Sequence, residues 1–191
     1  MDVPVLGITL GDPGGIGPEV VLKALYRLYP AFEFVPVIYG SRHVIEHPKL
    51  AYLVEKLSIR YGFRRDQAKL GNVYFQEVTQ CESFVIGKSD ATNGKFAYDY
   101  IQAAVEATSH GTIDAIVTAP ISKTSWKAAG IQATGHTTLL QQLTSSKHVT
   151  MGFYTPKLST VLATVHVPFS QVPDLLSKGT IFFFMKKYLC I

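Results

Sequence analysis

Short apolar runs alternate along this chain with stretches whose apolar residues recur at helical spacing. Four runs are rich in β-branched or aromatic residues and predict strands, over residues 5–10, 34–39, 72–78 and 113–118. The intervening stretches predict helices over residues 18–28, 52–61, 94–110 and 123–129, and a further helix that starts after residue 137. Strands that alternate with helices are typical of βαβ units. We therefore expect an α/β fold with three layers, α/β/α, and a mostly parallel sheet.

A fifth run, residues 161–167 (VLATVHV), is apolar almost throughout. Such a run predicts a strand that is covered on both faces of a parallel sheet. A chain that ends soon after a central strand leaves an apolar edge open to other chains. We therefore expect poor solubility for the isolated chain.

The pattern predicts two domains, the second of them incomplete. We assign residues 1–120 to a first α/β domain, residues 121–176 to part of a second, and residues 177–191 to an aberrant tail. The tail places three consecutive phenylalanines beside a methionine and two lysines. It is either a final edge strand or the result of a lost reading frame, beyond which the natural sequence continued. We favour the second interpretation.

Charge and cysteine content argue against several classes of protein. The chain has 18 Lys+Arg and 14 Asp+Glu, and the basic residues are scattered. Without a basic stripe and interleaved aromatics, nucleic-acid binding is not expected. Two cysteines without CxxC spacing indicate a reducing compartment rather than a disulfide scaffold. The N-terminus lacks a signal-peptide pattern and no run is long enough to span a bilayer, so we expect a cytoplasmic protein with no membrane partner.

A glycine-rich segment, GDPGGIGPE at residues 11–19, joins the first predicted strand to the first predicted helix. Backbone N–H groups in such a turn can approach a bound anion at the positive end of the helix. The segment lacks the Gly-Lys-Ser/Thr of a Walker A loop and the third glycine of a Rossmann turn. Glycines are equally required by a tight turn that binds nothing, and both interpretations stay open.

Two histidines lie at positions where sites often form, one at an expected helix start and one near an expected strand end. His136, in Thr134-Gly135-His136-Thr137, lies where a helix should begin and can bind a phosphate or carboxylate, although a lone histidine is more often structural. His166 ends the run at 161–167, where parallel sheets place their ligands. As a metal ligand it needs at least two more ligands. The other histidines are not spaced convincingly to supply them: His43, His47, His110 and His148.

Three further polar residues are ambiguous. Lys123 follows a predicted strand and can either steer an anion or lie solvated at a helix start. Asp90 has no assigned role, and Asn93, which precedes a glycine, most simply marks a turn.

Four segments narrow the interpretation when they are taken together and in order: GDPGGIGPEVVLKAL, DAIVTAPISK, GHTTLL and ATVHVPFSQVPDLL. With them, residues 3 to about 176 resemble the 4-hydroxythreonine-4-phosphate dehydrogenase family of pyridoxal phosphate biosynthesis. The resemblance implies a two-domain fold similar to isocitrate and isopropylmalate dehydrogenases, and a homodimer.

The resemblance also implies a reaction. NAD or NADP oxidises the 3-hydroxyl of 4-phosphooxy-L-threonine, a small phosphorylated substrate, and the β-keto acid decarboxylates to 3-amino-2-oxopropyl phosphate. A divalent cation (zinc, magnesium or cobalt) assists. His136 and Thr137 match the family's substrate-binding pair, and His166 matches the first of three metal-binding histidines. No catalytic residue is identified.

The chain departs from the family pattern at several positions. Thr138 stands where the family usually has Glu, and Gly14 where Ala is common. The family's second and third metal histidines have no counterpart after His166, so we expect little or no activity from this chain. Alternatives are a sister dehydrogenase of 4-phospho-threonate, a non-catalytic metabolite-binding remnant and, less favoured, a phosphate-binding transferase.

Overall fold

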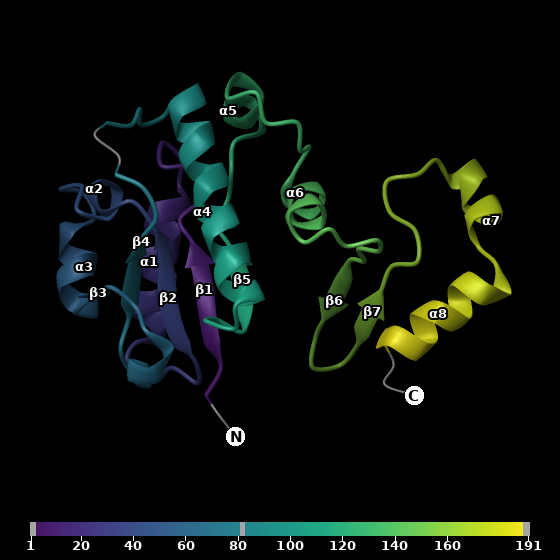
Figure 1. The fold of residues 1–191 in the computed structure, drawn as a ribbon, viewed down its shortest axis with the longest axis horizontal. Helices are drawn as coiled ribbons and strands as arrows, with labels where there is room; N and C mark the ends of the chain where they lie inside the picture. Colours follow the sequence, from purple (N-terminus) through teal and green to yellow (C-terminus); the bar gives the residue numbers. More distant parts are fainter. Residues whose placement is uncertain (1–2, 81–82, 189–191) are drawn as a thin grey trace. The chain divides into compact units, whose positions relative to one another are not determined.

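The computed structural model describes residues 3–80 and 83–188, and the residues up to Thr144 contain a parallel sheet (Figure 1). In the described part of the chain the strand order is β3-β4-β2-β1-β5, and each neighbouring pair is parallel. The strands are β1 (Val5–Thr9), β2 (Val35–Gly40), β3 (Arg60–Tyr61), β4 (Tyr74–Glu77) and β5 (Ala115–Thr118). The α/β fold with a mostly parallel sheet is confirmed.

Helices cover both faces of this sheet because its strands alternate their side chains between two apolar clusters. On one face, Ile8, Ile38 and Phe75 pack with helices α1 (Gly17–Leu28) and α3 (Ala51–Leu57). On the other face, Val37 and Tyr39 pack with α4 (Ala91–Ser109). The sheet therefore forms the middle of three layers, as expected.

Helix α4 is buried on a second side as well. Its residues Ala97 and Ile101 pack with Trp126 and Leu139, which lie in α5 (Lys123–Ala128) and α6 (His136–Leu143). The long helix therefore joins the sheet to the two short helices that carry the histidine segment.

The chain divides into two compact units, an N-terminal unit up to Thr144 and a C-terminal unit from Ser145. The N-terminal unit also contains α2 (Arg42–Ile45) and a 3-10 turn, η1 (Arg65–Gln67). The C-terminal unit consists of β6 (Gly152–Tyr154), β7 (Ser159–Val161), η2 (Phe169–Gln171), α7 (Val172–Leu175) and α8 (Lys178–Tyr188). The boundary falls inside the predicted second domain, and the domain assignment stays a prediction.

The central strand predicted over residues 161–167 is wrong. Only its first residue is in a strand, β7, which pairs antiparallel with β6. Val165 is 37% exposed, and His166 adopts a left-handed backbone with φ of 54°. An apolar run becomes a buried strand only where neighbours pair with it on both sides, and a left-handed residue ends extended backbone.

Two other expected elements differ from the structure. The tail, if it was an edge strand, should be extended, but residues 178–188 form α8, with the Ser177 hydroxyl accepting the N–H of Thr180 as a helix cap does. The helix predicted over residues 52–61 ends at Leu57, because Ser58 is left-handed, and the chain continues into β3. Among the described residues, no helix combines the length and apolar character needed to cross a bilayer.

Candidate functional site

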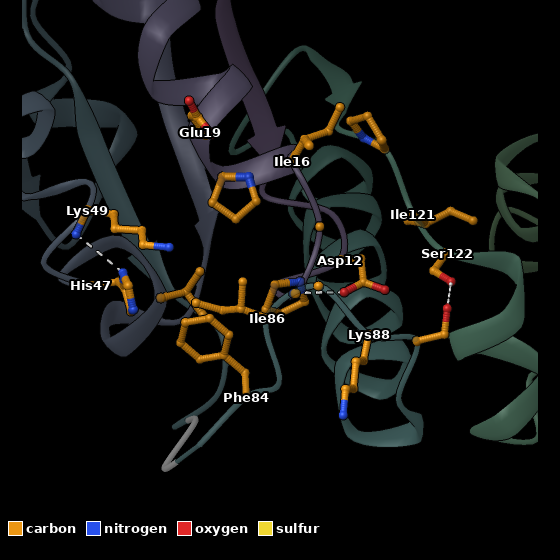
Figure 2. A pocket seen from close by; sticks show the side chains of 18 of the residues that line it. Asp12, Ile16, Glu19, His47, Lys49, Phe84, Ile86, Lys88, Ile121 and Ser122 are labelled. Carbon is orange, nitrogen blue, oxygen red and sulfur yellow. Dashed lines mark hydrogen bonds between the residues drawn. The ribbon is translucent and has the colours of Figure 1, made fainter.

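A pocket of about 580 Å³ lies in the N-terminal unit, where the strands of the sheet end (Figure 2). Its walls are the segments that follow the strands: residues 12–19 after β1, 44–50 after β2, 84–89 after β4 and 120–122 after β5. From β1 the chain proceeds to β2 on one side, and it later returns to place β5 on the other. Open parallel sheets bind their ligands at such a switch point, beyond the carboxyl ends of the strands.

Asp12 anchors the glycine-rich turn. Its side chain is buried, with one carboxylate oxygen accepting the N–H of Gly14 at 2.8 Å and the other accepting the Ser125 hydroxyl at 2.8 Å. The Asp12 N–H donates to the carbonyl of Pro120 at 3.0 Å. The carboxylate is therefore occupied in tying the turn after β1 to the segment after β5.

The glycines of this turn serve close packing. A Cβ on Gly11, whose φ is +70°, would lie 2.2 Å from the carbonyl oxygen of Pro120, and one on Gly17 would lie 2.3 Å from that of Leu10. The N–H groups of Gly14 and Gly15 already bond to Asp12. The structure thus supports the tight-turn interpretation, because these two amides are not directed at a ligand.

The pocket combines apolar walls with cations at its margin. Ile16, Phe84 and Ile86 supply apolar surface. In Figure 2, Lys49 lies on one side of Phe84 and Ile86, and Lys88 lies on the other. A ligand with a flat apolar ring and an attached anionic group matches such a lining.

His136 begins α6, as predicted, and is half-buried. Its ring meets the indole of Trp126 edge-on, with centroids 6.0 Å apart. Burial lowers the pKa of His136 from its usual value, and a backbone hydrogen bond to Ala119 opposes that shift. Its Nε2 is buried without a hydrogen-bond partner in the described part of the chain. Thr137, the next residue, is exposed.

Lys123 lies close to the histidine segment. Its Cε is 3.8 Å from the position that a Cβ on Gly135 would occupy. The structure therefore brings together three residues singled out in the sequence, Lys123, His136 and Thr137. Of these, His136 hydrogen-bonds to the backbone of Ala119, which directly precedes the pocket residues 120–122.

His166 belongs to the C-terminal unit, which is a separate compact unit. It is exposed, and the residues described contain no group of three or more His, Cys, Asp or Glu that could hold a metal ion. A metal centre needs three protein ligands at least. The role of His166 as a metal ligand stays a prediction.

Sequence reasoning missed the buried Ser125, and it interpreted the buried Asn93 as a turn residue. Ser125 receives the N–H of Asp90 and donates to Asp12. Asn93 lies inside α4, which begins at Ala91 after the cap residue Asp90. The Asn-Gly pair indicated a turn, whereas Asn93 bonds to the backbone of Val85, eight residues before it. No pattern marked Ser125, because its partner Asp12 lies 113 positions away.

Comparison with known proteins agrees with this architecture. The family model described as "Pyridoxal phosphate biosynthetic protein PdxA" matches residues 33–188. The chain is 34% identical over 183 residues to a 4-hydroxythreonine-4-phosphate dehydrogenase of Synechocystis, covering 93% of this chain and 51% of that protein. It is 31% identical over 179 residues to a Clostridium botulinum protein provisionally named D-threonate 4-phosphate dehydrogenase, covering 92% and 53%.

The solved structure of a 4-hydroxythreonine-4-phosphate dehydrogenase from Burkholderia phymatum superposes with a TM-score of 0.81 at 28% identity, covering 98% of this chain and 57% of that one. The chain spans about half the length of the curated relatives it matches. The matched residues include the strands β2, β4 and β5 and the histidine segment, and with them the chain belongs to the PdxA family of pyridoxal phosphate biosynthetic proteins.

Proposed function

We propose that this chain takes part in the oxidation of 4-phosphooxy-L-threonine by NAD or NADP. The β-keto acid formed then decarboxylates to 3-amino-2-oxopropyl phosphate, within pyridoxal phosphate biosynthesis in the cytoplasm. The names of the relatives support this substrate. The observation that carries the proposal is the position of Lys123, His136 and Thr137 beside the segment that also walls the pocket.

The pocket is the proposed site of the dinucleotide. Its apolar residues Ile16, Phe84 and Ile86 suit a flat base or ring, and Lys49 and Lys88 suit phosphate groups. The nicotinamide, when bound, supplies the hydride acceptor for the alcohol. The protein's own part is to orient that ring and to exclude water from it.

The start of α6 is the proposed anchor for the substrate. Free N–H groups in the first turn of a helix favour an anion, and the Thr137 hydroxyl and the Lys123 ammonium add donors. Because burial lowers the pKa of His136, its imidazole is neutral near pH 7. A neutral ring whose Nε2 is buried and has no partner within the described structure can accept a hydrogen bond from a substrate hydroxyl once the atoms that cover it move aside.

The divalent cation that the family resemblance implies is not assigned a step. Among the residues that the structure describes, no group of three His, Cys, Asp or Glu could hold this ion, and His166 is the ligand that the resemblance assigns to this chain.

One observation favours a second substrate, 4-phospho-threonate, which has a hydroxyl where the first has an ammonium group. Thr138 replaces the Glu that is usual in the family, and its hydroxyl pairs with that of Thr134 at 2.9 Å. A carboxylate beside His136 would attract an ammonium group, whereas two hydroxyls have no such preference.

The test separates nucleotide binding from turnover. NAD⁺ is titrated calorimetrically into the wild-type protein and the Lys88→Ala variant, with Lys69→Ala, an exposed lysine outside the pocket, as the matched control. We expect about a fivefold or greater rise in Kd for Lys88→Ala only, since a lysine–phosphate contact is worth about 1 kcal/mol. Equal affinities in all three proteins would remove the dinucleotide from this pocket. NADH formation with each of the two phosphorylated acids then decides between the substrates.

A further inference from the structure

The wall of the pocket formed by residues 84–89 is not held by apolar burial alone. The side chains of Val85 and Ile86 are 41% and 48% exposed. Phe84 does pack into the core cluster and meets the rings of His43 and His47 edge-on. The backbone of the residues that follow Phe84 therefore needs another interaction to hold it in place.

Asn93 supplies that interaction. Its side chain is fully buried within α4, where Nδ2 donates to the carbonyl of Val85 at 2.7 Å and Oδ1 accepts the N–H of Val85 at 3.3 Å. A buried amide has few ways to satisfy both of its ends, and here one residue's backbone satisfies both. The Asn93 amide therefore bonds to both backbone groups of Val85, as a residue of a neighbouring strand would.

The wall at 84–89 packs closely against Gly14. A Cβ at position 14 would lie 2.1 Å from the Val85 carbonyl oxygen and 2.3 Å from Nδ2 of Asn93. The N–H of Gly87 donates to the Gly14 carbonyl at 2.8 Å. Two separate segments therefore hold the wall: Asn93 of α4 bonds to Val85, and Gly14 of the glycine-rich turn bonds to Gly87.

We propose that Asn93 is a positioning residue for the pocket. It sets a close approach, in this chain, between the wall at 84–89 and the glycine-rich turn, an approach that Gly14 permits and that the alanine common in the family would prevent. The part of the test that uses NAD⁺ rests on the proposed function. Asn93 itself is not among the residues that line the pocket. It acts through Val85, which places Phe84 and Ile86 on the pocket side of the segment.

The first measurement needs no ligand. Hydrogen exchange of the Val85 and Gly87 amides is compared in the wild type, Asn93→Ala, and the control Asn72→Ala, whose amide bonds to Tyr74 away from the pocket. We expect at least about tenfold faster exchange at both amides in Asn93→Ala, because the loss of two hydrogen bonds raises the open population by that factor. Unchanged exchange at these two amides would overturn the proposal.

The second measurement is a double-mutant cycle on the Kd for NAD⁺, with Gly14→Ala, Asn93→Ala and the double variant. Each single change should weaken binding about tenfold, and the double variant should be no weaker than about tenfold, because both changes displace the same contact. A merely structural role gives multiplied losses instead and contradicts the proposal. Gly14→Ala disturbs the same contact from the glycine-rich turn. If Asn93→Ala fails to fold, the Kd of Gly14→Ala for NAD⁺ therefore still tests that contact.

The two proposals fail separately. If the wild type binds no NAD⁺ while exchange at Gly87 still responds to Asn93→Ala, the dinucleotide assignment is lost and the positioning role stands. If NAD⁺ binds equally well to all four proteins, Asn93 does not position the pocket.

Discussion

The N-terminal unit of this chain buries its large apolar residues, whereas the C-terminal unit exposes several of its own. In the N-terminal unit, Leu22 and Phe75 are fully buried between the sheet and its helices. In the C-terminal unit, Phe169 is 91% exposed and Phe182 is 67% exposed. Since burial of apolar surface is the main driving force of folding, an apolar residue stabilises a unit only where a second layer covers it. The stability of the described structure should therefore reside in the N-terminal unit.

The largest expected effect is the contrast between two phenylalanines. Phe75→Ala removes a core side chain of β4 and should lower the free energy of unfolding by about 3–5 kcal/mol. Phe169→Ala should change it by no more than about 0.5 kcal/mol, because that side chain is almost fully exposed. Urea denaturation followed by circular dichroism measures both. Similar losses for the two variants would mean that the C-terminal unit has a core of its own.

A second contrast concerns two aspartates. Asp12→Ala leaves the Gly14 amide and the Ser125 hydroxyl without their buried partner and should cost about 2–4 kcal/mol. Asp174→Ala, at an exposed position in α7, should lie within about 0.5 kcal/mol of the wild type. The same urea midpoints report both. A small effect of Asp12→Ala would show that the turn after β1 is held by its glycines alone.

A smaller effect depends on pH. The folded pKa of His136 lies below its usual value, so the unfolded chain binds this proton first as the pH falls below about 6.5. The stabilisation is present above that pH and is lost as the pH falls towards the folded pKa. The urea midpoint of the wild type should therefore drop between neutral pH and about pH 5. His136→Asn should show a shallower drop, and an identical pH profile would contradict the assigned burial.

The smallest effect tests the left-handed residue of the C-terminal unit. Glycine adopts positive φ without the steric cost that other residues bear, so His166→Gly should raise stability, by at most about 1 kcal/mol. Val165→Gly, at a neighbouring residue without positive φ, should lower it. Thermal unfolding of the two variants gives the comparison. A loss in both would show that the His166 side chain makes contacts that stabilise its segment.

The sequence predicted well those elements whose pattern and partners are both local. The runs at 5–10 and 113–118 became β1 and β5, and the helix after Pro18 became α1, because each ends at glycine or proline. The site was predicted in part: His136 does begin a helix, and the turn after β1 does wall a pocket.

The remaining features depend on tertiary context that one sequence does not display. The run at 161–167 has the composition of a buried strand, but no neighbouring strand pairs with it beyond Val161 in the described structure. Asn93 has the local signature of a turn, and its role follows from the position of Val85. A hydrogen bond from a side chain to the backbone of a loop carries no periodic signal.

The bond between Ser125 and Asp12 joins residues 113 positions apart, and it has a consequence for biosynthesis. Ribosomes release a protein from its N-terminus, so the glycine-rich turn emerges long before the serine that fixes it. Until α5 has left the exit tunnel, the Asp12 carboxylate lacks its Ser125 partner, and the turn after β1 is not yet tied to the segment after β5.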